Sequence, residues 1–88
     1  MHHAELTQSV REMAARVLAE LRLSDGSELR ESLLLREGLY CGRRFEGEHG
    51  DAIWFIEEDE LKIIGADGRV RRVIHHVSQL TVPRRAAA

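Results

Sequence analysis

The chain has 88 residues, of which 43% are hydrophobic and 32% charged, and its formal net charge is −2. A chain of this length forms one modest core, which excludes a two-domain enzyme and a nucleotide-binding α/β fold of ordinary size. The composition also excludes a disordered chain and a disulfide-stabilised toxin. We therefore expect a small soluble α+β domain.

Residues 6–21 are predicted to form an amphipathic helix. Their apolar side chains recur three or four positions apart, which gives one stripe along a helix of 3.6 residues per turn. The following Ser24-Asp25-Gly26-Ser27 favours a stop, with Gly26 as the left-handed residue. The stripe consists of Leu6, Val10, Met13, Ala14, Val17, Leu18 and Leu21.

The segment 27–37 has two interpretations. Ser27 is a suitable N-cap for a short helix, whereas the apolar run within 32–36 is typical of a strand. We favour a first strand at 32–36, preceded by a turn or a short helix at 27–31.

After Gly38 the pattern changes to short strands and tight turns. Residues 53–56 are rich in β-branched and aromatic side chains, and the sequence from Gly65 to Gly68 is a strong hairpin signal. Residues 77–82 either extend the last strand or form a closing one. The predicted strands are 39–46, 51–58, 60–64 and 69–76, separated by turns at 47–50, 57–59 and 65–68.

The predicted fold is α+β, with an N-terminal amphipathic helix packed on an antiparallel meander sheet of three to five strands. We expect a single domain over residues 1–82 and a disordered C-terminal tail over 83–88. The helix is expected to lie across one face of the sheet, because nothing else covers its apolar stripe.

The predicted strand 51–58 is apolar on both of its faces. Side chains alternate along a strand, so Ile53 and Phe55 point one way while Trp54 and Ile56 point the other way. One helix covers one face of a sheet, and the second apolar face therefore needs another cover.

We predict that a second copy supplies this cover, in a homodimer whose interface contains Trp54, Ile56 and Ile64. Aromatic residues at the centre of such a patch are typical energetic anchors. In the alternative, residues 33–35 fold over this face and Trp54 is an ordinary core residue.

Charge is distributed unevenly along the chain. The net charge is −5 over residues 38–60 and +5 over 61–88. Basic residues beside aromatic ones are typical of single-stranded nucleic-acid binding, which gives an alternative function. Its predicted surface consists of Tyr40, Arg43, Arg44, Arg71 and Arg72. We favour pairing of these arginines with acidic residues on neighbouring strands.

We predict no catalytic residues, no metal site and no cofactor. Cys41 is the single cysteine, and nothing in the sequence places a histidine beside it as a base. His75 and His76 are adjacent on a predicted strand and point to opposite faces. The acidic run 57–60 lacks the spacing of a calcium loop and is interpreted as a solvated turn.

The longest unbroken apolar run is 52–56, much shorter than the roughly 20 residues of a membrane span, so we expect no membrane association. The single cysteine and the absence of an apolar leader predict a cytoplasmic location. The predicted function is a small interaction or regulatory module of unknown process. We expect it to be self-associating, to have a protein partner that is not identified, and to have no enzymatic activity.

Overall fold

The N-terminal apolar stripe forms helix α1, His3–Glu20, in the computed structural model, which describes residues 3–25 and 29–81. The helix begins three residues earlier than the apolar stripe. The stripe faces the sheet as predicted, and its buried members are Val10, Met13, Ala14, Val17 and Leu18.

Helix α1 ends in a Schellman motif. Arg22 has a left-handed φ of 61°, and its N–H donates to the carbonyl of Ala19 at 3.0 Å. The N–H of Leu23 donates to the carbonyl of Leu18 at 2.8 Å, and both leucines are buried. The left-handed residue at this helix end is therefore an arginine. Gly26, the residue predicted for that role, lies outside the described residues.

After α1 the described chain next forms five antiparallel strands in the order β1-β2-β3-β4-β5, which confirms the predicted meander. The ambiguous segment 32–36 is part of the first strand. The strands are β1 Arg30–Arg36, β2 Leu39–Glu46, β3 Gly50–Phe55, β4 Glu60–Gly65 and β5 Val70–His75.

The turns follow from residues that tolerate positive φ. Glu37 and Gly38 have φ values of 54° and 81° and form the two-residue connection between β1 and β2, as in a type I′ turn. Gly68 has a φ of 82° in the connection between β4 and β5, where the sequence predicts a tight hairpin.

The segment after β5 forms a short helix, α2, Val77–Thr81, so the prediction of a strand at 77–82 is wrong. His76 adopts a left-handed φ of 57° and turns the chain. The carboxylate of Asp59 accepts a hydrogen bond from the N–H of Ser78 at 2.9 Å and caps the helix. Val77 is fully buried, so α2 closes one end of the core.

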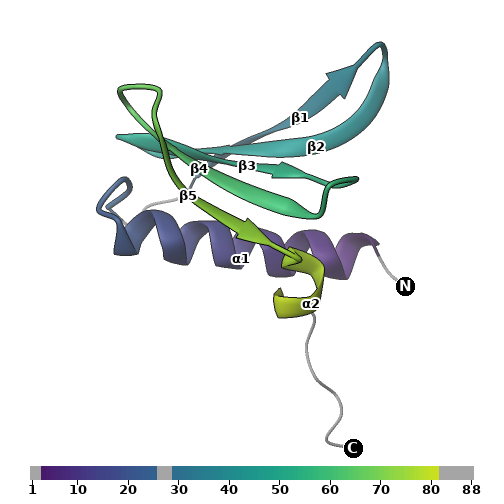
Figure 1. Ribbon diagram of the computed structural model, residues 1–88, viewed down its shortest axis with the longest axis horizontal. Helices are drawn as coiled ribbons and strands as arrows, with labels where there is room; N and C mark the ends of the chain where they lie inside the picture. Colours follow the sequence, from purple (N-terminus) through teal and green to yellow (C-terminus); the bar gives the residue numbers. More distant parts are fainter. Residues whose placement is uncertain (1–2, 26–28, 82–88) are drawn as a thin grey trace, which may run out of the picture.

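Helix α1 lies across one face of the sheet, here called the helix face, and α2 packs beside α1 (Figure 1). The core therefore lies between one helical layer and one sheet. The sheet residues fully or almost fully buried in it are Phe45, Ala52, Trp54, Leu61 and Ile63.

Neither described helix is long and apolar enough to cross a membrane. The C-terminal segment 83–88, predicted to be a disordered tail, lies outside the described residues.

Candidate interaction surfaces

The three residues predicted to form a dimer interface do not lie on one surface. Trp54 is 1% exposed and packs in the core under α1. Ile64 is opposite Asp51 in the sheet register and lies on the other face. Ile56 follows β3 and is partly buried against the core. The prediction that Trp54 lies on the uncovered face is therefore wrong, and the patch does not form as predicted.

The error concerns which set of side chains on β3 faces the helix. Both alternating sets are apolar, so the hydrophobic pattern does not distinguish them. In the structure, buried Ala52 and Trp54 alternate with half-buried Ile53 and Phe55. The small side chain of Ala52 leaves room for α1 to pack over this central strand.

The face of the sheet opposite α1, here called the open face, mixes apolar and charged side chains. Ile53 lies between Arg44 and Lys62 on the neighbouring strands, and Phe55 lies beside Glu60. The apolar residues of the open face are Leu34, Ile53, Phe55, Ile64, Val70 and Val73.

The carboxylates on the open-face side of β2, β3 and β4 lie beside arginine or histidine side chains, and Lys62 lies over the ring of Phe55. Arg44 donates to Asp51 at 2.7 Å, and its Nε lies 3.8 Å from a Glu46 oxygen. His75 lies 3.0 Å from Glu60. These pairs leave the open face without a dominant charge, which disfavours a strongly charged partner there.

The β1–β2 hairpin carries exposed apolar side chains. Leu33 and Leu35 are 53% and 62% exposed, and Leu39 is 71% exposed. In Figure 1 the hairpin curves away from α1 toward its turn, which explains why the helix does not cover it. Since β1 is the first strand in the sheet order, these leucines lie along or beside a sheet edge.

A β-bulge changes the orientation of Tyr40. Leu34 is opposite Gly42 and Leu35 is opposite Tyr40, so Cys41 is the additional residue on β2. Strict alternation along β2 would place Tyr40 on the same face as Arg44. The bulge instead places it on the helix face, where Arg43 donates a hydrogen bond to its hydroxyl oxygen at 2.8 Å.

A charged network joins α1 to the hairpin on the helix face. The carboxylate of Glu31 accepts hydrogen bonds from Arg11 at 2.7 and 3.0 Å and from Arg43 at 2.6 Å. His3, at the start of α1, forms a hydrogen bond of 3.1 Å with Tyr40 and stacks on Trp54 at 5.8 Å between ring centroids. These contacts hold the β1–β2 hairpin against α1.

The same contacts shift three ionisation equilibria, and the hydrogen bond with Glu31 raises the pKa of Arg11. The hydrogen bond from Arg11 lowers the pKa of Glu31, with a further contribution from Arg43, and partial desolvation opposes both. The hydrogen bond to Tyr40, followed by that to Glu31, raises the pKa of Arg43. Glu31 is therefore held as a carboxylate between two guanidinium groups.

The residues predicted to bind nucleic acid are distributed over the molecule. Tyr40 and Arg43 lie together on the helix face, while Arg44 lies on the open face. Arg72 is 3.6 Å from Glu20 of α1, and the Arg71 side chain lies next to Gly65. The structure therefore brings two of the five residues together.

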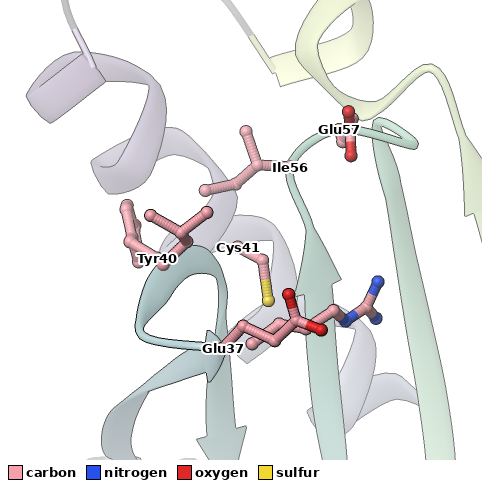
Figure 2. Close-up of a pocket in the computed structure, with 7 residues that line it drawn as sticks. Glu37, Tyr40, Cys41, Ile56 and Glu57 are labelled. Carbon is pink, nitrogen blue, oxygen red and sulfur yellow. The ribbon is translucent and has the colours of Figure 1, made fainter.

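A depression with a volume of about 420 Å³ lies where the hairpin meets the end of β3 (Figure 2). Figure 2 shows the Cys41 side chain among those of Tyr40, Ile56 and Glu37. The half-buried Cys41 thiol donates to the carbonyl of Leu34 at 3.5 Å. The lining residues are Arg36, Glu37, Leu39, Tyr40, Cys41, Ile56 and Glu57.

The chemistry of this depression is limited. Thiol catalysis needs a base that takes up the proton, and the lining contains no histidine. Within residues 3–25 and 29–81, no group of three or more His, Cys, Asp or Glu side chains is placed to hold a metal ion. The depression is therefore a mixed apolar and charged surface that includes exposed Leu39.

Comparison of the chain with protein-family models, with curated proteins and with solved structures gave no match.

Sequence reasoning did not identify Leu33 and Leu35 as surface residues. Their exposure depends on the curvature of the hairpin away from α1, which the local pattern does not encode. One signal was present, because the first strand of a meander is an edge strand, and residues 33–35 are three consecutive leucines within it.

Proposed function

We propose that this protein is a small interaction module that acts through self-association and has no catalytic activity. The observation that carries the proposal is the exposure of aliphatic side chains on the β1–β2 hairpin, where Leu33, Leu35 and Leu39 are each more than half exposed. Leu33 and Leu35 share one face of the hairpin, and exposed apolar side chains gathered on one face are typical of sites for protein–protein contact.

The pattern of ion pairs supports a protein partner over a nucleic acid. Arg43 is paired with Glu31, Arg44 with Asp51, and Arg72 lies near Glu20. Nucleic-acid binding relies on basic side chains that neutralise phosphates from a common surface. Arginines already paired with carboxylates, and placed on different faces, supply little of that attraction.

The depression around Cys41 supports binding over catalysis. Its lining offers a thiol, carboxylates, a guanidinium and a phenol, without the imidazole that would activate the thiol. Exposed Leu39 and Tyr40 form part of its lining, so an apolar side chain of a partner would find apolar contacts there.

The test is the mass of the full-length protein in solution. Light scattering coupled to size exclusion, at several concentrations from 5 to about 200 µM, is expected to report twice the chain mass of 10.0 kDa. A monomer over the whole range overturns the proposal.

The nucleic-acid alternative has its own measurement. Fluorescence anisotropy with a labelled single-stranded oligonucleotide at low salt is expected to show no saturable binding. Tight binding that weakens steeply with salt would favour the alternative function.

A further inference from the structure

Strand β1 has a free edge in this sheet. It pairs with β2 on one side only, since the sheet order begins with β1. The free side of an edge strand presents unpaired backbone N–H and C=O groups, which are a template for another strand. The exposed Leu33 and Leu35 side chains stand on the same strand.

The other edge, β5, carries features that discourage strand addition. The register shift opposite Ile63 and Ile64 leaves Arg71 as an additional residue on β5, which bends that edge. Exposed Arg71 and Arg72 add like charges, and the strand runs directly into α2. Bulges and basic side chains are common protections of natural sheet edges.

The middle of β1 has none of these protections. Its central residues are Leu33, Leu34 and Leu35, with no proline and no charge among them. The additional residue of the β1–β2 pair is Cys41 on β2, so the free side of β1 is not bulged. The carboxylate of Glu31 is held by Arg11 and is thereby directed to the helix side of the sheet.

We propose that β1 pairs antiparallel with β1 of a second copy about a two-fold axis through Leu34, which joins the two sheets into one of ten strands. This inference rests on the proposed self-association and names its interface. Two-fold dimers are the commonest symmetric assemblies, and their interface uses the same patch twice.

The side chains of β1 select this register. With the axis at Leu34, Leu33 is opposite Leu35 of the partner subunit, and Ser32 is opposite Arg36 of the partner subunit. The next pair along is Glu31 with Glu37 of the partner subunit, and Glu37 lies in the turn beyond the end of β1, so no like charges face each other within the paired strands. Opposed aliphatic pairs on one face stabilise a sheet.

The neighbouring registers are less favourable. An axis at Leu33 places Arg30 opposite Arg36 of the partner subunit, and like charges directly opposite are destabilising. An axis at Leu35 places Leu33 opposite Glu37 of the partner subunit. Glu37 has a φ of 54° and lies in the turn, outside the strand. Registers shifted by one residue would place helix-face side chains opposite open-face side chains.

The same arrangement covers the exposed leucines. Leu33 lies on the helix face, like Arg43, the residue opposite it on β2. Leu35 lies two residues further along β1 on the same face. In the dimer, Leu33 and Leu35 of both copies therefore meet on one side of the joined sheet, between the two α1 helices. In this pairing the leucines of one copy contact the leucines of the other. This favours a second copy of the chain over an unrelated strand as the partner.

The first test compares two substitutions of exposed aliphatic residues in the full-length protein. Leu35→Lys changes the β1 edge, and Val70→Lys changes the open face at a similar exposure, 62% against 55%. Leu35→Lys is expected to raise the dimer dissociation constant at least tenfold, and Val70→Lys to leave it within about twofold. Sedimentation equilibrium measures both constants, and circular dichroism checks that each variant is folded.

The second test determines the register of the β1–β1 pairing by disulfide cross-linking in a Cys41→Ala background. Leu34→Cys places the two thiols directly opposite each other, at a Cα separation of about 4.5–5.5 Å that suits a disulfide. Ser32→Cys is the matched control, because its two copies lie about four residues apart along the paired strands, roughly 13 Å. Oxidation is expected to give a covalent dimer with Cys at position 34 and none with Cys at position 32.

The outcomes separate this inference from the proposed function. A monomeric wild-type protein overturns both. Three results overturn the β1 interface alone. The first is a dimer that withstands Leu35→Lys, the second is a dimer that dissociates with Val70→Lys, and the third is a dimer that fails to cross-link through position 34. In the second of these cases the open face mediates self-association.

Discussion

Asp59 holds Ser78 by two hydrogen bonds across 19 residues of sequence: its carboxylate accepts from the backbone N–H at 2.9 Å and from the hydroxyl at 2.8 Å. The carbonyl of Asp59 also accepts a hydrogen bond from the N–H of Val77 at 3.1 Å. One residue in the β3–β4 turn therefore fixes the start of α2 and the burial of Val77.

Replacing Asp59 is expected to destabilise the fold more when the new side chain retains fewer of these interactions. Asp59→Ala removes the cap and places alanine at a φ of 58°, at an expected loss of about 2–3 kcal/mol. Asp59→Asn keeps an acceptor and tolerates that φ, so its expected loss is about 1 kcal/mol. Urea unfolding followed by circular dichroism at fixed protein concentration measures both.

Ser78→Ala is the control for this prediction. It removes the hydroxyl bond and leaves the backbone bond, so the expected loss is about 0.5–1.5 kcal/mol. A loss from Asp59→Ala no larger than that from Ser78→Ala would contradict the capping role.

The role of Asp59 shows why part of the fold was not predictable from the sequence. The meander followed from local signals, such as the hairpin between Gly65 and Gly68 and the alternation within 53–56. The cap of α2 comes from a residue far away in the sequence, so local propensity at 77–82 gave no helix signal. Distant contacts of this kind override weak local preferences.

The candidate surface was predictable only in part, for two physical reasons. Ile53 and Trp54 are both large and apolar, so the choice of the face under α1 depends on three-dimensional packing. The bulge at Cys41 inverts the orientation of Tyr40 and has no unique sequence mark. The predicted pairing of arginines with acidic residues on neighbouring strands is seen for Arg43 with Glu31, whereas Arg72 lies near Glu20 of α1.

Glu31 is expected to make stability depend on acidic pH. Its pKa is lowered in the folded protein, first by the hydrogen bond from Arg11, so the unfolded chain takes up a proton at higher pH than the folded one. This contribution to stability is fully present above the unfolded pKa of about 4.5 and is lost as the pH falls through the folded pKa.

Glu31→Gln is therefore expected to lower stability by about 1–2 kcal/mol at pH 7 and to flatten its dependence on pH below about 4.5. Glu58→Gln, at an exposed position in the β3–β4 turn, is the control and is expected to preserve the wild-type profile. The free energy of unfolding in urea, measured between pH 3 and pH 7, checks this. Parallel profiles for wild type and Glu31→Gln would contradict the prediction.

Gly42 is expected to be the least replaceable of the described glycines. A Cβ atom there would lie 2.0 Å from the carbonyl oxygen of Trp54, which is backbone of the paired strand and does not yield easily. Gly42→Ala is therefore expected to destabilise by about 3 kcal/mol or more, through displacement of β2 from β3.

Gly38 provides the contrast, because a Cβ there meets nothing within 4 Å but its φ is +81°. Gly38→Ala is expected to cost about 1 kcal/mol, the ordinary penalty for a left-handed alanine. Thermal unfolding of the two variants under identical conditions gives the comparison. Equal shifts in melting temperature would show that the close approach at Gly42 is relieved without cost.

Trp54 and Ile53 are neighbours on β3 that point to opposite faces, and the same substitution at each is expected to have opposite outcomes. Trp54→Glu removes a side chain that is 1% exposed from the core and places a charge there without a partner, so the protein is expected to be unfolded. Ile53→Glu places a carboxylate on the open face between Arg44 and Lys62, so a folded protein with a loss of about 1–2 kcal/mol is expected. Amide chemical-shift dispersion and far-ultraviolet circular dichroism distinguish the two. A folded Trp54→Glu variant beside an unfolded Ile53→Glu variant would mean that the helix covers the face that carries Ile53 and Phe55.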